Sequence, residues 1–183
     1  MEKKTIAEIL DKKLKEGNIS LIIDNYDDLF SSFDPRNYSE KALSDDFLQE
    51  CRKAARNKEE ELELRISIAK KERNPREETI IKKRLKEHFT RNYRKLTKAI
   101  MKEKKIGAWW IFSGSTSIAL TIVIKLLNVG QITNLIIDSI LIIPGWFAIW
   151  EGLSRIFIEH KELTPEEKFY KKMSKAEISF AGY

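Results

Sequence analysis

The chain has 183 residues, of which 34% are charged, with one cysteine and a mean hydropathy of -0.41. A single cysteine excludes an internal disulfide and is typical of a reducing compartment. The average hydropathy resembles that of a soluble protein, but the charges are unevenly distributed. Residues 1–80 carry 16 Lys+Arg and 19 Asp+Glu, whereas residues 81–105 carry 11 Lys+Arg and 2 Asp+Glu, a net +9.

The first elements predict a small α/β domain. Thr5–Glu16 places Ile6, Ile9, Leu10 and Leu14 on one helical face, and Gly17 is suited to end that helix. The apolar run Ile19–Ile23 fits a buried strand, but it could also continue as a helix through Leu29 and Phe30. The pattern leaves both readings of residues 19–30 open.

Four aspartates follow, and they raise the question of a metal site. Asp24, Asp27, Asp28 and Asp34 could offer oxygen ligands to Mg²⁺ or Ca²⁺, with Arg36 nearby, but their spacing fits no EF-hand loop. Acids around a turn or helix start are also common as capping or solvated residues. We predict no metal and no cofactor, although the sequence leaves open whether the loop Asp24 to Asp34 binds a metal.

The next signals predict one helix, one strand and a long second helix. Ser44 is a typical N-cap before a helix of about 13 residues. Apolar residues alternate from Leu62 to Ile68, which is the period of a strand with one buried face. Asn74 and Pro75 then mark a helix start, and no breaker interrupts the pattern before Gly107.

Two apolar stretches predict a transmembrane hairpin. Ile106–Ile124 has no charged residue, and Leu126–Trp150 has only Asp138. Each approaches or exceeds the roughly 20 residues that a helix needs to cross a bilayer. A hairpin buried in a soluble protein is one alternative, and re-entry at Pro144 is another. We prefer two spans, with a short turn at Asn128–Gln131 and a kink at the proline.

Flanking charges and tryptophans predict the topology. Basic residues beside a span are retained in the cytoplasm, and tryptophans gather at the membrane interface. Both termini are therefore expected in the cytoplasm, at the inner (cell) membrane. The residues predicted to contact lipid headgroups are Lys82, Lys83, Arg91, Arg94, Lys95, Lys98, Lys102, Lys104, Lys105, Trp109, Trp110, Trp146 and Trp150.

Two groups within the apolar stretches are candidate functional residues. Lys125 and Asp138 lie near the turn and could meet across the hairpin or between protomers. Ionisable residues inside a membrane suggest proton or ion movement, but a structural pair whose lysine reaches the outer headgroups explains them as well. A small-residue face on the first span favours self-association, and it comprises Gly107, Ser113, Gly114, Ser117 and Thr121.

No motif indicates catalysis. The glycines are scattered singly, so a phosphate-binding loop is not predicted, and neither His88 nor His160 has the partners of a metal site or a catalytic triad. The basic helix could neutralise nucleic-acid phosphates, but its place beside a membrane span is explained first by topology and lipid contact.

Three segments resemble an uncharacterised prokaryotic family of two-span membrane proteins. They are the block Asp34–Leu48 (DPRNYSEKALSDDFL), the helix start Arg73-Asn74-Pro75 with its continuation Leu85–Phe89, and Gly145–Glu151 (GWFAIWE). Asn37 stands where the family pattern is expected to have proline. The resemblance implies a two-span protein with a cytoplasmic α/β domain, and it implies no activity.

The combined expectation is an α+β membrane protein with two short strands. A cytoplasmic α/β domain (1–74) is joined by a basic helix (75–105) to two transmembrane helices (106–127 and 132–152), followed by a cytoplasmic tail (153–183). We expect a non-enzymatic homo-oligomeric scaffold, partner-recruiting or membrane-sensing protein that binds lipids and an unknown protein. The alternative is a small oligomeric channel that uses Lys125 and Asp138.

Overall fold

The computed structural model describes residues 18–56, 58, 62–127, 130, 135–158, 161 and 163–183. The helix predicted over Thr5–Glu16, His160 and most of the predicted turn at Asn128–Gln131 lie outside these residues. The chain divides into two compact units. We call Met1–Arg94 with Glu167–Tyr183 the sheet unit, and Lys95–Glu166 the hairpin unit.

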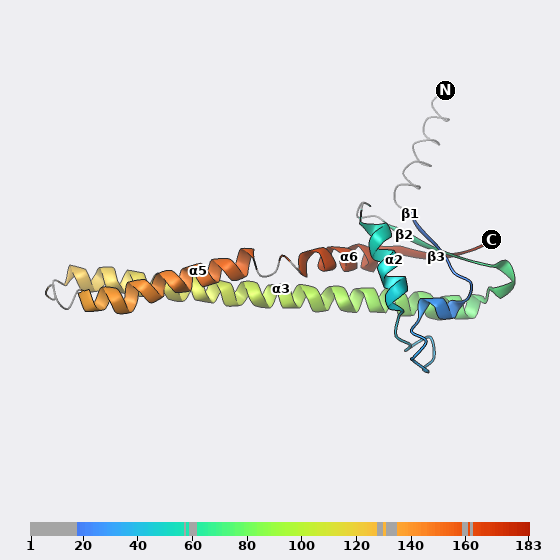
Figure 1. Ribbon diagram of the computed structural model, residues 1–183, viewed down its shortest axis with the longest axis horizontal. Coiled ribbons are helices and arrows are strands. Elements are labelled where there is room, and N and C mark those ends of the chain that lie inside the picture. The colour runs from blue at the N-terminus through green and yellow to red at the C-terminus, as the bar shows by residue number, and fades with distance from the viewer. Residues whose placement is uncertain are drawn as a thin grey trace, which may run out of the picture. The chain divides into compact units, whose positions relative to one another are not determined.

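The sheet unit contains three parallel strands (Figure 1). They are β1 (Asn18–Ile22), β2 (Glu63–Ile68) and β3 (Glu177–Gly182), in the order β1-β2-β3. The prediction of two strands and a C-terminal tail is therefore wrong in this part. The last residues pair with β2 through the whole length of both strands, from Glu63 opposite Glu177 to Ile68 opposite Gly182.

The predicted helix starts are confirmed. The Ser44 hydroxyl accepts a hydrogen bond from the Phe47 amide at 3.5 Å and caps α2 (Asp45–Ala55). The Asn74 side chain accepts one from the Arg76 amide at 3.1 Å, where α3 (Pro75–Leu126) begins. Residues 19–30 contain both a strand and a short 3-10 helix, η1 (Tyr26–Leu29), and a second 3-10 turn, η2 (Lys70–Glu72), precedes α3.

The core of the sheet unit lies on one face of the sheet. Leu64, Ile66 and Ile68 of β2 are fully buried, whereas Arg65 between them is exposed. Two crossovers of the same hand that move in the same direction along a sheet place their helices on one face, which explains this one-sided burial. The helices supply a matching set of buried residues from α2, from the start of α3, and from α6 (Leu163–Lys175): Phe47, Leu48, Cys51, Ile81, Leu85, Phe89, Phe169, Tyr170 and Met173.

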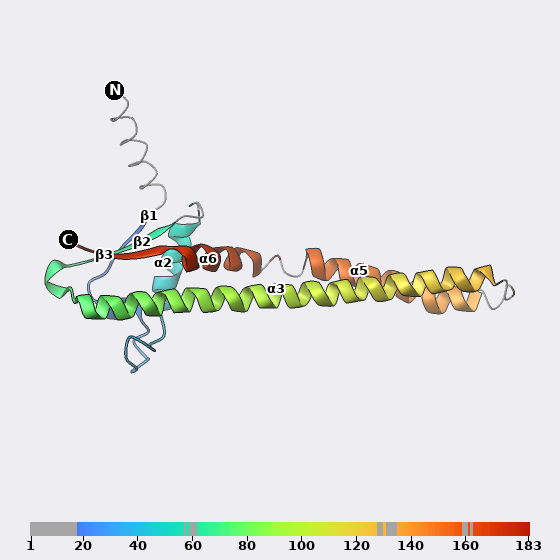
Figure 2. The ribbon, with the colours of Figure 1, turned by 180° about the vertical axis from the view of Figure 1, so that it is seen from behind.

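The hairpin unit pairs the end of α3 with a second apolar helix over Leu135–Phe157, which extends beyond the predicted end at residue 152. Figure 2 shows α5 (Ile143–Phe157) alongside the end of α3. A π-helical turn, η3 (Asp138–Ile142), lies directly before Pro144. Proline has no N–H to close an α-helical bond, so the irregularity predicted as a kink is accommodated as a π-helical turn. Gly130, between the two helices, has a φ of 101°, which favours glycine.

Candidate functional site

Four glycines bring the two apolar helices into backbone contact. A Cβ atom placed on Gly114 would lie 2.5 Å from the Gly145 carbonyl oxygen, and one on Gly152 would lie 2.5 Å from the Gly107 carbonyl oxygen. Glycine pairs therefore face each other at two levels of the hairpin, separated by seven residues on each helix. Such close approach increases van der Waals contact between helices that gain little from burying apolar surface within lipid.

The predicted small-residue face is mostly used inside the chain. Gly107 and Gly114 face α5, and the Ser117 hydroxyl donates a hydrogen bond to the Leu141 carbonyl oxygen at 2.8 Å. Thr121 is buried, whereas Ser113 is exposed. The analysis of the sequence missed Gly145 and Gly152, although they repeat the seven-residue spacing of the first pair. Self-association through this face would have to displace α5.

Ion pairs lie near both ends of the hairpin. Near the turn, the Lys125 ammonium nitrogen is 2.9 Å from each carboxylate oxygen of Asp138, so this predicted pair meets within one chain. Their side chains are 44% and 34% exposed. At the other end, Arg155 reaches Glu103 of α3 at 3.1 Å and Glu151 of α5 at 2.9 Å. This second set was not predicted, because its partners are far apart in sequence.

The outer surface of the hairpin is apolar. Each apolar helix is long and hydrophobic enough to cross a membrane, and only 17% of its most apolar window is buried. The core helix of a soluble protein would be mostly buried, so this exposure disfavours the buried-hairpin alternative. All four tryptophans are exposed, as are most of the basic residues assigned to lipid contact. Lys82 differs, because it is half-buried with its ammonium over the Phe180 ring.

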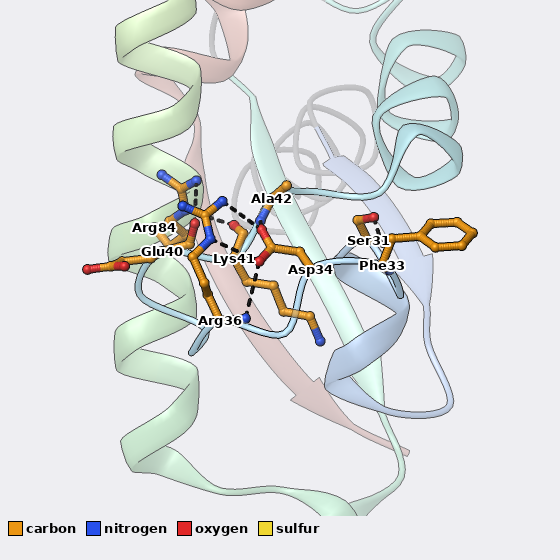
Figure 3. A network of polar contacts seen from close by, with 8 residues as sticks. All are labelled: Ser31, Phe33, Asp34, Arg36, Glu40, Lys41, Ala42 and Arg84. Carbon is orange, nitrogen blue, oxygen red and sulfur yellow. Dashed lines mark hydrogen bonds and ion pairs between the residues drawn. The ribbon is translucent and has the colours of Figure 1, made fainter.

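The Ser31–Leu43 loop of the sheet unit is a second candidate site. Asp34 lies at its centre and accepts hydrogen bonds from Arg36 Nε at 2.9 Å, from its terminal nitrogen at 2.7 Å, and from the Ala42 amide at 2.7 Å (Figure 3). The Arg36 guanidinium holds the pKa of Asp34 well below its usual range. Arg84 of α3 donates to the carbonyl oxygens of Lys41 and Glu40 at 3.1 and 3.2 Å.

These contacts hold the loop while Phe33 points away from the polar network (Figure 3). Phe33 is 96% exposed, the most exposed large apolar side chain in the described part of the chain. Sequence reasoning missed it, because a single phenylalanine in a polar loop carries no periodic signal. An exposed aromatic side chain on an ordered loop is a suitable anchor for a protein partner.

The acidic cluster takes part in capping and ion pairing. Asp28 accepts the amides of Asp24 and Asn25 at 2.9 and 3.1 Å, and Asp27 pairs with Lys41 at 2.7 Å. Asp34 belongs to the loop network described above. Within the described ranges, no group of three histidine, cysteine or acidic side chains is placed to hold a metal ion.

The buried polar groups of the sheet unit have structural surroundings. Glu78 accepts two hydrogen bonds from Arg73, at 2.8 and 2.9 Å, and a third from the Tyr26 hydroxyl at 3.1 Å. Burial raises the pKa of the Cys51 thiol to about 12, so this cysteine is a poor nucleophile. Burial, with Arg84 and other cations nearby, lowers the pKa of His88 to about 4.

Comparison with protein-family models, with curated proteins and with solved structures found no match to this chain. The resemblance to a two-span prokaryotic family therefore stays a prediction. The geometry of the chain itself is the basis for assigning a function.

Proposed function

We propose that this chain is an integral membrane protein whose two apolar helices span the cell (inner) membrane and hold the sheet unit in the cytoplasm. There the sheet unit acts as a scaffold that recruits a partner, without catalysis of its own. The chain acts as a homo-oligomer in contact with anionic lipid headgroups.

The parallel pairing of β2 with β3 is the observation that carries this proposal. β2 precedes the hairpin and β3 follows it, yet the two strands are hydrogen-bonded neighbours in one sheet. A protein that crosses the bilayer twice returns to the side where it started, so a two-span hairpin is compatible with this sheet. A single crossing would leave β2 and β3 on opposite sides of the membrane and would prevent their pairing.

The charges support the cytoplasmic side. Residues 81–105 carry a net +9, whereas residues 126–137, which contain the turn, have no Lys or Arg. Basic residues near the ends of a span favour cytoplasmic retention. Each one near an anionic surface contributes about 1 kcal/mol of attraction.

Phe33 supports the recruitment role. The Asp34 and Arg84 contacts order the loop in advance, so a partner that binds Phe33 would lose less conformational entropy than one that binds a flexible segment. The loop has no nucleophile with an adjacent base, which favours binding over catalysis.

Cysteine accessibility tests the topology. Leu127→Cys places a thiol beside the turn, and Lys71→Cys places one on the surface of the sheet unit; both positions are exposed. A membrane-impermeant maleimide added to intact spheroplasts should label the first variant and should label the second only after lysis. The unmodified chain is the control, because Cys51 is fully buried. Labelling of both variants only after lysis would contradict a two-span topology.

The alternative is a small oligomeric channel or ion-coupled unit. The partly exposed Lys125–Asp138 pair at the end of an apolar hairpin favours it, as does the π-helical turn that begins at Asp138, since such turns often lie at functional sites. Native mass spectrometry in lipid and ion flux from liposomes test this alternative. A ring-sized assembly whose flux is lost in Asp138→Asn supports the channel, whereas a monomer or an unaffected flux removes it.

A further inference from the structure

One face of the sheet is uncovered in the part of the chain that the structure describes. Its residues form three rows across the strands: Asn18–Glu63–Glu177, Ser20–Arg65–Ser179 and Ile22–Ser67–Ala181. Ile22 is 74% exposed, and no residue of these rows whose exposure is described is buried. Parallel sheets are almost always covered on both faces. This face therefore lacks the cover that its strand arrangement leads us to expect.

We propose that the segment Thr5–Glu16 forms an amphipathic helix that covers this open face. The segment lies directly before β1, so a short connection at Gly17 would turn it back over the sheet. A helix of twelve residues is about 18 Å long. Strands of five or six residues are about 17 to 20 Å long. The segment thus matches the sheet in length.

The chemistry of the helix face also matches the rows in order. A helix that enters β1 through Gly17 places its carboxyl end over the amino ends of the strands. Lys13 then lies over the row that contains Glu63 and the exposed Glu177. Ile6, near the other end of the same helix face, lies over the row that contains the exposed Ile22.

The central row is compatible with such a helix. Ser20 and Ser179 have small side chains on either side of Arg65, and small side chains allow a helix to approach a sheet closely. Arg65 already has a carboxylate partner, because it lies 3.4 Å from Glu63. Covering this row would therefore not bury an unpaired charge.

Thiol labelling tests the cover. Ile22→Cys and Lys53→Cys introduce thiols at two exposed positions, the first on the open face and the second on α2. A bulky maleimide should label the first at least about tenfold more slowly than the second in the full chain. Deletion of residues 2–16 should make the two rates equal. Equal rates in the full chain would overturn the proposal.

Disulfide formation separates the other occupants. In the full chain, Ile6→Cys with Ile22→Cys should form an intramolecular disulfide under mild oxidation, and Ile6→Cys with Lys53→Cys should not. A disulfide found only between chains would assign the face to a second copy and overturn the proposal. Protection of Ile22→Cys that survives the deletion and requires lipid vesicles would overturn it in favour of the bilayer.

Discussion

The two units place large and small residues in opposite positions. The interior of the sheet unit contains large apolar side chains such as Leu64 and Phe89, and charged residues such as Arg65 face outward. In the hairpin unit, glycines and Thr121 lie between the helices, while leucines, isoleucines and tryptophans face outward. Water drives large apolar groups together, whereas lipid solvates them and leaves close backbone packing as the source of helix contact. The environment of each unit therefore determines which residues can form its interior.

Leucine truncation should show the largest difference between the two units. Leu64→Ala should reduce the free energy of unfolding of the sheet unit by about 2 to 5 kcal/mol, because it leaves a cavity in a water-driven core. Urea unfolding followed by labelling of the buried Cys51 thiol measures this loss. Leu120→Ala, on the outer face of the hairpin, should change stability by less than about 0.5 kcal/mol, because lipid fills the space.

The four tryptophans all lie in the hairpin unit, so their fluorescence during titration of mixed micelles with SDS reports on that unit alone. Equal losses at Leu64 and Leu120 would contradict the assignment of lipid as the solvent of the hairpin.

Enlarging a glycine should have the opposite dependence on position. Gly114→Leu forces the two helices apart, because its first added carbon would already lie 2.5 Å from a backbone oxygen. We expect a loss of about 1 to 3 kcal/mol in the SDS titration, typical of overpacking. Ser115→Leu, at an exposed position on the same helix, is the matched control and should have no effect. A similar loss in both variants would mean that the helix itself, and not the contact, is sensitive.

Acidification should affect the sheet unit through His88. Its folded-state pKa of about 4 lies below the ordinary value of 6.5, so below pH 6.5 the unfolded chain takes up a proton that the folded chain does not. Stability should therefore fall by about 1 to 2 kcal/mol from pH 7 to pH 5. Urea unfolding followed by circular dichroism measures this change.

His88→Gln should flatten the profile between pH 7 and pH 5. Glu78, whose pKa is lowered by Arg73, contributes stability that is lost only at lower pH, below its ordinary value of 4.5. An unchanged slope in His88→Gln would assign the effect to other groups.

The smallest effect on stability is expected at Phe33. Phe33→Ala removes a side chain with almost no contacts, so the free energy of unfolding should change by less than about 0.5 kcal/mol. Recruitment of a partner should nevertheless be lost, and site-specific photocrosslinking at position 33 in cells tests this. A measurable destabilisation would show that Phe33 packs within the protein and is not a binding anchor.

The order of residues was sufficient to predict every local element that depends on nearby chemistry. Helix starts at Ser44 and Asn74, the alternating strand before Ala69, and two apolar helices of spanning length all follow from caps, periodicity and hydropathy. These signals act over a few residues, so they need no knowledge of the rest of the fold. The Lys125–Asp138 pair was also within reach, because a short turn brings its two residues together.

Contacts between distant segments required the three-dimensional arrangement. The third strand was taken as a tail because Glu177–Gly182 is a strand only beside β2, more than a hundred residues earlier in the chain. The glycine face was assigned to self-association because its partners, Gly145 and Gly152, become opposite only when the hairpin closes in a particular register. In both cases the stabilising partner lies far away in the sequence, and pairing over such distances depends on packing that no local pattern encodes.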